Sequence, residues 1–262
     1  MRKSAKKEGG IKMGINYNPF SLEGKTILVT GASSGIGQAT AIECSKMGAK
    51  VIITARNEER LKETLSQLEG EGHQMIMAEL TKQDDIERLV SEISTLHGLV
   101  LCAGKGMTSP FSFSTRDKYD EIFNVNFFAP VELLRLLVKK KKLEKESSVV
   151  FVSSIGGIGS FSLGNGIYGA SKAAINSTMK FCARELASKK IRVNSVNPGM
   201  VNTKLIKGGS ISEEQHLLDM QQYPLKRYGE PEEIAFGIIY LLSDASGWVT
   251  GHSLIIDGGV TI

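Results

Sequence analysis

Short apolar runs recur along the chain, and a longer stretch of mixed character separates each run from the next. Runs of roughly four to eight apolar, often β-branched residues are typical of strands that are buried on both faces. These runs predict strands at residues 25–30, 50–55, 75–78, 98–101, 148–153, 191–196 and 253–256.

The stretches between these strands carry apolar residues three or four positions apart, which is the period of an amphipathic helix. They predict helices that end at residue 47 and that span 58–69, 84–94, 117–142 (bent near Pro130), 168–189 and 231–242, whereas residues 200–227 are polar and predict irregular structure. Strands that alternate with helices indicate an α/β fold with a doubly wound, mostly parallel sheet in three layers, the Rossmann fold.

The pattern indicates a single domain over residues 20–262. Residues 1–19 are basic and lack an apolar period, so we expect a disordered tail there, and a translation start at Met13 would also explain it. No apolar run approaches the roughly 18 residues of a membrane span, so we expect no membrane partner.

Composition narrows the function classes. The 262 residues are 41% hydrophobic and 23% charged, which is ordinary for a globular protein, and the net charge of +4 is too modest to predict a nucleic-acid partner. The three cysteines, Cys44, Cys102 and Cys182, lie far apart without metal-ligand spacing. They predict reduced thiols in a cytoplasmic protein and no metal site.

A glycine-rich turn follows the first predicted strand directly and leads into a helix. A strand, a glycine turn and a helix N-terminus together offer backbone N–H groups to a phosphate. The candidate cofactor-binding residues in this turn are Gly31, Ser33, Ser34, Gly35, Ile36 and Gly37.

The end of the second predicted strand indicates which cofactor is bound. Dinucleotide folds read the ribose 2′ position there, with an acid for the hydroxyl of NAD or an arginine for the phosphate of NADP. The sequence Thr54-Ala55-Arg56 has no acid and one guanidinium. It favours NADP(H) over NAD(H) with Arg56 as the contact, and a surface arginine at a strand end is the alternative.

Residues 153–172 hold the candidate catalytic groups. Tyr168 and Lys172 are four apart, so a helix places them on one face, and Ser154 precedes them across a glycine-rich loop. A phenol with a pKa of about 10 is a poor base at neutral pH, but a nearby ammonium stabilises the phenolate. Tyr168 would then act as a general acid/base, and Ser154 would donate a hydrogen bond to a substrate oxygen.

These motifs together resemble the short-chain dehydrogenase/reductase family, in its single-domain branch, over residues 20–262. The resemblance rests on Thr30-Gly31-xxx-Gly35-x-Gly37, Asn126, Ser154, Tyr168-xxx-Lys172, Pro198-Gly199, Thr250-Gly251 and Asp257-Gly258-Gly259, in that order. It extends equally to 3-oxoacyl-carrier-protein reductases, sugar and polyol dehydrogenases and steroid dehydrogenases, so the implied substrate is a small-molecule carbonyl or alcohol.

The resemblance implies a role for each matching residue. Tyr168 would protonate a carbonyl during reduction, or act as the base in the reverse direction, and Lys172 would assist it and bind the nicotinamide ribose. Ser154 would orient the substrate oxygen, and Asn126 would hold a water between Lys172 and solvent, with Ser153 and Asn124 as neighbouring alternatives. Further implied cofactor contacts are Tyr168 itself, Leu80, Ala103, Gly104, Pro198, Gly199, Val201 and Thr203.

Two positions and one spacing depart from the family pattern. Cys102 replaces an asparagine after the fourth strand, which implies altered packing, and Glu79 replaces an aspartate beside the adenine, which leaves the backbone contact at Leu80. The spacing from serine to tyrosine is also one residue longer than usual. All four catalytic residue types are kept, so the sequence predicts an NAD(P)(H)-dependent oxidoreductase. A cofactor-binding regulator or scaffold without turnover is the alternative, and the four-residue spacing disfavours an enoyl reductase.

Two surface features complete the expectations. Residues 204–222 mix apolar and charged positions, which suits either a lid over the substrate or a surface helix. The resemblance implies a homotetramer built through the helices at 117–142 and 168–189. Residues that suit either that interface or the core are Phe127, Phe128, Leu133, Leu134 and Met179.

Overall fold

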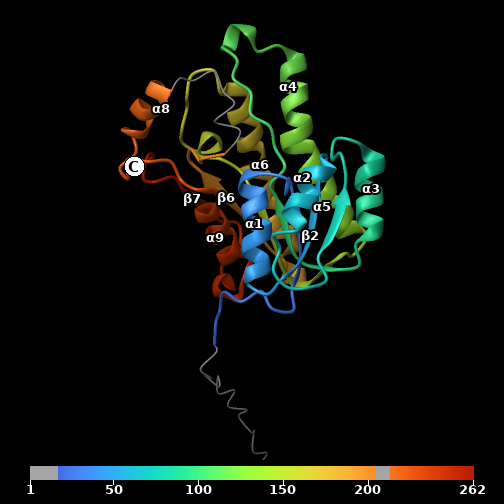
Figure 1. Ribbon diagram of the computed structural model, residues 1–262. Coiled ribbons are helices and arrows are strands. Elements are labelled where there is room, and N and C mark those ends of the chain that lie inside the picture. Colours follow the sequence, from blue (N-terminus) through green and yellow to red (C-terminus); the bar gives the residue numbers. More distant parts are fainter. Residues whose placement is uncertain (1–16, 204–212) are drawn as a thin grey trace, which may run out of the picture.

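Seven parallel strands form one sheet in the order β3-β2-β1-β4-β5-β6-β7 in the computed structural model, which describes residues 17–203 and 213–262 (Figure 1). The strands are β1 Thr26–Thr30, β2 Lys50–Ala55, β3 Gln74–Met77, β4 Leu96–Leu101, β5 Leu143–Val152, β6 Arg192–Pro198 and β7 Ser253–Ile256. The strand order reverses between β1 and β4, and sheets of this kind bind ligands outside the carboxyl ends of the strands at that point. The predicted α/β, doubly wound fold is confirmed.

Helices cover both faces of the sheet, which makes three layers (Figure 1). The first face carries α1 Gly35–Lys46, α2 Glu58–Leu65 and α9 Pro231–Leu242, and the second carries α3 Gln83–Glu92, α5 Ala129–Lys139 and α6 Gly166–Leu186. Two further helices are α4 Arg116–Phe123 and α8 Glu213–Met220. None of the helices in the described ranges is both long and apolar enough to span a membrane.

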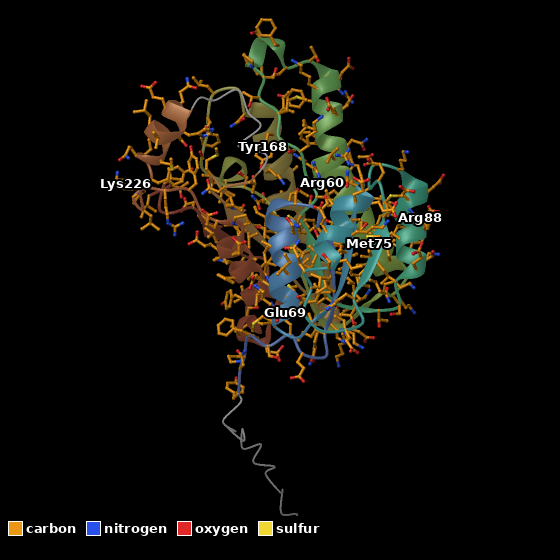
Figure 2. The ribbon with its side chains drawn as sticks, in the orientation of Figure 1. Arg60, Glu69, Met75, Arg88, Tyr168 and Lys226 are labelled. Carbon is orange, nitrogen blue, oxygen red and sulfur yellow. The ribbon has the colours of Figure 1, made fainter. Side chains whose placement is uncertain are left out.

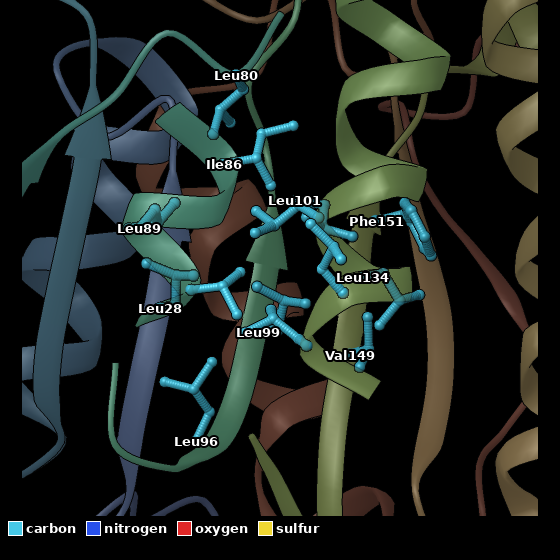
Figure 3. Packing of buried hydrophobic residues seen from close by; sticks show 14 of the residues in the cluster. Leu28, Leu80, Ile86, Leu89, Leu96, Leu99, Leu101, Leu134, Val149 and Phe151 are labelled. Atoms are coloured by element: carbon cyan, nitrogen blue, oxygen red, sulfur yellow. The ribbon is translucent and has the colours of Figure 1, made fainter. Parts of the chain in front are cut away.

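Each face of the sheet has its own hydrophobic core because successive strand residues point to opposite sides. In β1, Leu28 belongs to the core under α3, α5 and α6, whereas Ile27 and Val29 belong to the core under α1 and α9. Figure 3 shows the former core, with Leu99 and Val149 from neighbouring strands beneath the helices. Strands buried on both sides explain the continuous apolar runs of the sequence.

The single helix predicted over 117–142 is wrong. The chain instead forms α4, a π-helical segment Asn124–Phe128 and then α5, so the irregularity precedes Pro130 rather than bending the helix at it. Proline has no N–H, so Pro130 cannot donate to the carbonyl four residues earlier, which is that of Asn126. A wider π turn at this point is one way for a helix to accommodate such a break, and π segments are frequent at functional sites.

Two other expectations change. The stretch predicted as irregular over 200–227 contains the helix α8, whose sequence has too few apolar positions for a clear period. Of the predicted tail, residues 1–16 lie outside the described residues, and residues 17–19 already meet the domain: the Pro19 carbonyl accepts the N–H of Ala245 at 3.0 Å. The single domain beginning at residue 20 remains a prediction.

Candidate active site

The glycine-rich turn packs against the loop that follows β4. Gly31 has φ +67°, and a Cβ on it would lie 2.8 Å from the Cα of Ala103. A Cβ on Gly37 would lie 2.4 Å from the carbonyl oxygen of Gly31. Both positions therefore require glycine, Gly37 for space and Gly31 also for its backbone conformation. The turn brings the N-terminus of α1 to the carboxyl ends of β1 and β4, where the strand order reverses.

Thr30, the last residue of β1, fixes the loop after β4, and the sequence reasoning missed this role. Its buried hydroxyl accepts the N–H groups of Cys102 at 3.0 Å and Ala103 at 3.1 Å, and it lies 3.3 Å from the carbonyl of Val100. A hydroxyl residue at the end of a buried strand, directly before the glycine turn, is the sequence signal that could have revealed it. Thr30 thereby places Ala103 and Gly104 beside the turn.

Lys172 lies inside the site on α6 rather than at the surface. Its side chain is buried, its Nζ donates to the Val152 carbonyl at 2.9 Å, and it lies 5.7 Å from the ring centroid of Tyr168. The loop after β5 backs onto this helix so closely that a Cβ on Gly157 would lie 2.6 Å from the Lys172 carbonyl carbon. The structure therefore places the phenol and the ammonium together at the carboxyl end of β5.

The two neighbouring serines differ in their surroundings. Ser153 is buried, and its hydroxyl donates to the Lys172 carbonyl at 3.0 Å. Ser154 is half-buried, and its Oγ accepts the N–H of Gly156 at 3.1 Å. No acceptor for the Ser154 proton is found in the part of the chain that the structure describes. Ser154 is thus free to donate to a ligand, whereas Ser153 is occupied in holding α6 to β5.

Asn126 links three parts of the site. Its Oδ1 accepts the N–H of Lys105 at 2.8 Å, and its Nδ2 donates to the Lys105 carbonyl at 3.0 Å and to Ser171 Oγ at 3.1 Å. A Cβ on Gly104 would lie 3.3 Å from Asn126 Oδ1 and 3.5 Å from Lys172 Nζ. Asn126 is buried within this arrangement, whereas Asn124 is exposed on the surface.

Arg56 and Glu79 lie side by side where the sequence predicts the ribose 2′ position. Arg56 follows β2, is largely exposed, and has its Nη1 3.4 Å from Glu79 Oε2. Glu79 and the buried Leu80 follow β3, and the Glu79 N–H donates to Asp85 Oδ2 at 2.7 Å. This hydrogen bond holds the pKa of Asp85 below its usual range. The backbone of Glu79 is thus held by Asp85, while its side chain faces Arg56.

The segment after β6 closes the site from the other side. Gly199 N–H donates to the Ile256 carbonyl at 3.0 Å, and Met200 N–H donates to the Tyr223 hydroxyl at 3.1 Å. Val201 forms an isolated β-bridge with Gly229. A Cβ on Gly35 would lie 3.2 Å from Thr203 Cγ2. Thr203 thus stands against the glycine-rich turn. Tyr223 was not among the predicted residues, because its partner lies 23 positions away.

Only part of the predicted lid belongs to the described structure. Residues 204–212 lie outside it, and most of the remainder forms α8. Tyr228 anchors this helix: its buried hydroxyl donates to Asp219 Oδ2 at 2.8 Å, and its ring meets that of His216 edge to face at 5.9 Å. Burial and then the Asp219 carboxylate raise the pKa of Tyr228. Leu217 and Leu218 are exposed on α8.

Cys102 follows β4, directly before Ala103 and Gly104 of the site. Burial raises the pKa of the Cys102 thiol to about 12, against an opposing influence from Lys172. Cys102 is therefore a neutral thiol at neutral pH and contributes to packing rather than nucleophilic chemistry. Residues 17–203 and 213–262 contain no group of three His, Cys, Asp or Glu side chains able to hold a metal ion.

The residues at the carboxyl ends of β1 and β2 and at the start of α1 fit a dinucleotide. Ser34 precedes α1 without a side-chain cap, so the first N–H groups of the helix are available to an anion. The glycines leave backbone rather than side chains on this surface, and Thr54 Oγ1 on β2 is buried without a partner in the described structure. Fold and site together define the class of proteins that bind a nucleotide cofactor at a Rossmann crevice and place a Tyr–Lys pair beside it.

Comparisons with known proteins identify the family. The family model described as enoyl-(acyl carrier protein) reductase matches residues 31–261. A 3-oxoacyl-(acyl-carrier-protein) reductase from Rickettsia prowazekii is 34% identical over 92% of this chain and 98% of the relative, and a tropinone reductase homolog from Arabidopsis thaliana is 33% identical over 93% and 94%.

Solved structures agree with this identification. A dehydrogenase/reductase from Sinorhizobium meliloti has a TM-score of 0.85 with 32% identity and covers 93% of this chain and 98% of that one. The RhlG/NADP active-site complex from Pseudomonas aeruginosa has a TM-score of 0.87 with 29% identity and covers 94% and 100%. The chain belongs to the short-chain dehydrogenase/reductase family, and it is an NAD(P)-dependent oxidoreductase.

Proposed function

We propose that the protein transfers hydride between NADP(H) and a carbonyl or alcohol carbon of a small molecule, with Tyr168 as the general acid/base. The observation that carries this proposal is the buried Lys172, whose Nζ lies 2.9 Å from the Val152 carbonyl and 5.7 Å from the Tyr168 ring centroid. A phenol can give its proton to a substrate oxygen, and an ammonium beside it can replace that proton. The 3-oxoacyl and tropinone reductase names of the relatives support carbonyl chemistry.

When bound, the nicotinamide supplies the hydride, and this chain supplies position and a proton. The glycine-rich turn and the N-terminus of α1 would hold the pyrophosphate, and Ala103, Gly104 and the segment Pro198 to Thr203 would contact the remainder of the cofactor. Ser154 donates a hydrogen bond to the substrate oxygen. Tyr168 protonates this oxygen as negative charge develops on it during reduction, and Lys172 replenishes the proton.

Asn126 supports the supply of protons from solvent. Its side chain is hydrogen-bonded to Lys105 and Ser171. Its backbone carbonyl receives no N–H from position 130, because that residue is proline. That carbonyl is suited to accept a water, and Asn126 lies on the same buried side of the site as Lys172. A water at this carbonyl would link the ammonium to the solvent outside the π segment.

Arg56 determines whether NADP(H) or NAD(H) binds more tightly. A guanidinium recognises the 2′-phosphate of NADP through charge-assisted hydrogen bonds, and NAD has a hydroxyl at that position. We expect the wild type to bind NADPH more tightly than NADH, and Arg56→Ala to weaken NADPH binding about tenfold, the loss that 1.4 kcal/mol produces. Titration of nicotinamide fluorescence measures both affinities. Unchanged NADPH affinity in Arg56→Ala would make Arg56 an ordinary surface residue.

Turnover separates this proposal from its alternatives. A cofactor-binding regulator or scaffold would bind NADPH but oxidise it with no member of a broad panel of ketones, aldehydes and 3-oxoacyl thioesters. An enoyl reductase would act on the enoyl thioester instead. The i, i+4 placement of Tyr168 and Lys172 on α6 supports the carbonyl reductase, because both groups then face one reacting oxygen.

The homotetramer is also proposed, with its interface on the π-helical segment Asn124–Phe128, labelled η2, and on α6. Leu133, Leu134 and Met179 are buried in the core of the chain, so they are unavailable for an interface. Phe128 and Phe181 are the exposed large apolar residues on η2 and α6, two segments that contact each other. We expect light scattering to give four times the mass of one chain, and Phe181→Glu to lower it, with Phe236→Glu on α9 as the control. A monomer mass for the wild type at micromolar concentration would contradict this assembly.

A cytoplasmic location completes the proposal. Its support is that Cys44, Cys102 and Cys182 are all free thiols, as is usual in a reducing compartment.

A further inference from the structure

Arg56 and Glu79 stand side by side because their strands are neighbours. The parallel strands β2 and β3 pair with Ala55 opposite Met77, so the residues that follow them emerge at the same edge of the sheet. Arg56 Nη1 and Glu79 Oε2 are 3.4 Å apart there. Figure 2 shows the edge concerned: Arg60, at the start of α2, lies toward the same end of the molecule as Tyr168, and Glu69 lies toward the other end.

Glu79 is the fixed partner of this pair. Its Oε1 accepts the hydroxyl of Thr81 at 2.9 Å, and its backbone N–H is held by Asp85. Its side chain is 27% exposed, whereas the side chain of Arg56 is 74% exposed. A restrained carboxylate therefore faces a guanidinium that is free to turn toward solvent or toward a ligand.

We propose that Glu79 is a residue that determines cofactor specificity: it weakens the binding of the 2′-phosphate and so reduces the preference for NADP(H) over NAD(H). The proposal rests on the proposed function, since it concerns the cofactor of that same site. A 2′-phosphate that binds Arg56 must compete with the Glu79 carboxylate for the guanidinium. It also brings close to two negative charges next to that carboxylate.

A 2′-hydroxyl meets the opposite situation. It carries no charge, and a carboxylate can accept its proton in a hydrogen bond, which is the usual way for dinucleotide folds to hold the ribose of NAD. The Arg56–Glu79 pair thus offers one group for each cofactor. Because an exposed ion pair is itself weak, the repulsion between Glu79 and the phosphate carries most of the effect.

Binding measurements on the whole protein test this directly. The affinities for NADPH and NADH are measured by nicotinamide fluorescence and by calorimetry for the wild type, Glu79→Gln, Arg56→Ala and the double variant. Glu71→Gln is the matched control, because Glu71 is an exposed acid just before the start of β3, at the opposite edge of the sheet. Thermal melts of each variant confirm folding.

We expect Glu79→Gln to bind NADPH about tenfold more tightly, to bind NADH equally or less tightly, and to lose most of its gain in the Arg56→Ala background. The control Glu71→Gln is expected to change neither affinity. Unchanged or weaker NADPH binding by Glu79→Gln overturns the inference, because the carboxylate would then be neutral or would position Arg56. If Arg56→Ala still weakens NADPH binding in that case, the role of Arg56 in cofactor preference is kept and only the role of Glu79 is rejected. If the wild type binds neither nucleotide, both the proposed function and this inference are rejected.

Discussion

Tyr168→Phe is expected to reduce carbonyl turnover by about 10³-fold or more while leaving the affinity for NADPH close to that of the wild type. General acid catalysis contributes about 10² to 10⁴ in rate, and this variant removes the acid with a single oxygen atom. The ring of Phe fills the same space beside Lys172, whose ammonium keeps its hydrogen bond to the Val152 carbonyl. The loss therefore appears in kcat rather than in folding or cofactor binding.

The measurement is NADPH oxidation with the best substrate of the carbonyl panel, followed under single-turnover conditions. Tyr240→Phe is the matched control, because it removes the same hydroxyl from α9, where the Tyr240 ring packs on Phe20 at 6.4 Å. We expect the control to turn over like the wild type. Wild-type rates in Tyr168→Phe would show that another group moves the proton and would remove Tyr168 from the mechanism.

The sequence predicted the elements that are set by local pattern. The strands β2 and β7 and the helix α9 have the predicted bounds, because a continuous apolar run or a regular helical period records burial directly. Three motif residues from separate segments are neighbours in the structure: a Cβ on Gly104 would lie 3.3 Å from Asn126 Oδ1 and 3.5 Å from Lys172 Nζ. Their catalytic roles remain a prediction.

Features that depend on long-range partners were not predictable in this way. The two hydrogen bonds between Asn126 and the backbone of Lys105 connect positions 21 apart, and the hydroxyl of Thr30 reaches Cys102 across 72 positions. Neither of these contacts produces a periodic pattern in the sequence. Arg56 and Glu79 meet only because β2 and β3 are adjacent, so their contact required the strand order as well as the strand ends. The departure at Glu79 was visible in the sequence, but its partner was not.

Gly37→Ala is expected to disable the cofactor site through the backbone. The added Cβ would lie 2.4 Å from the Gly31 carbonyl oxygen, 2.8 Å from its carbon and 3.2 Å from the Thr30 carbonyl oxygen. All three are backbone atoms that cannot rotate away, so the turn must open. We expect a loss of about 2 kcal/mol in the free energy of unfolding, within the range for overpacking, and NADPH binding weaker by more than about tenfold.

Urea unfolding and NADPH titration measure the two effects separately. Gly159→Ala is the matched control, because a Cβ there meets no atom within 4 Å, and we expect it to change neither quantity. The same methyl group is then expected to be harmful at Gly37 and without effect at Gly159, which isolates the steric cause. NADPH affinity equal to that of the wild type in a folded Gly37→Ala variant would mean that the turn yields without loss, and that the pyrophosphate is held elsewhere than at the N-terminus of α1.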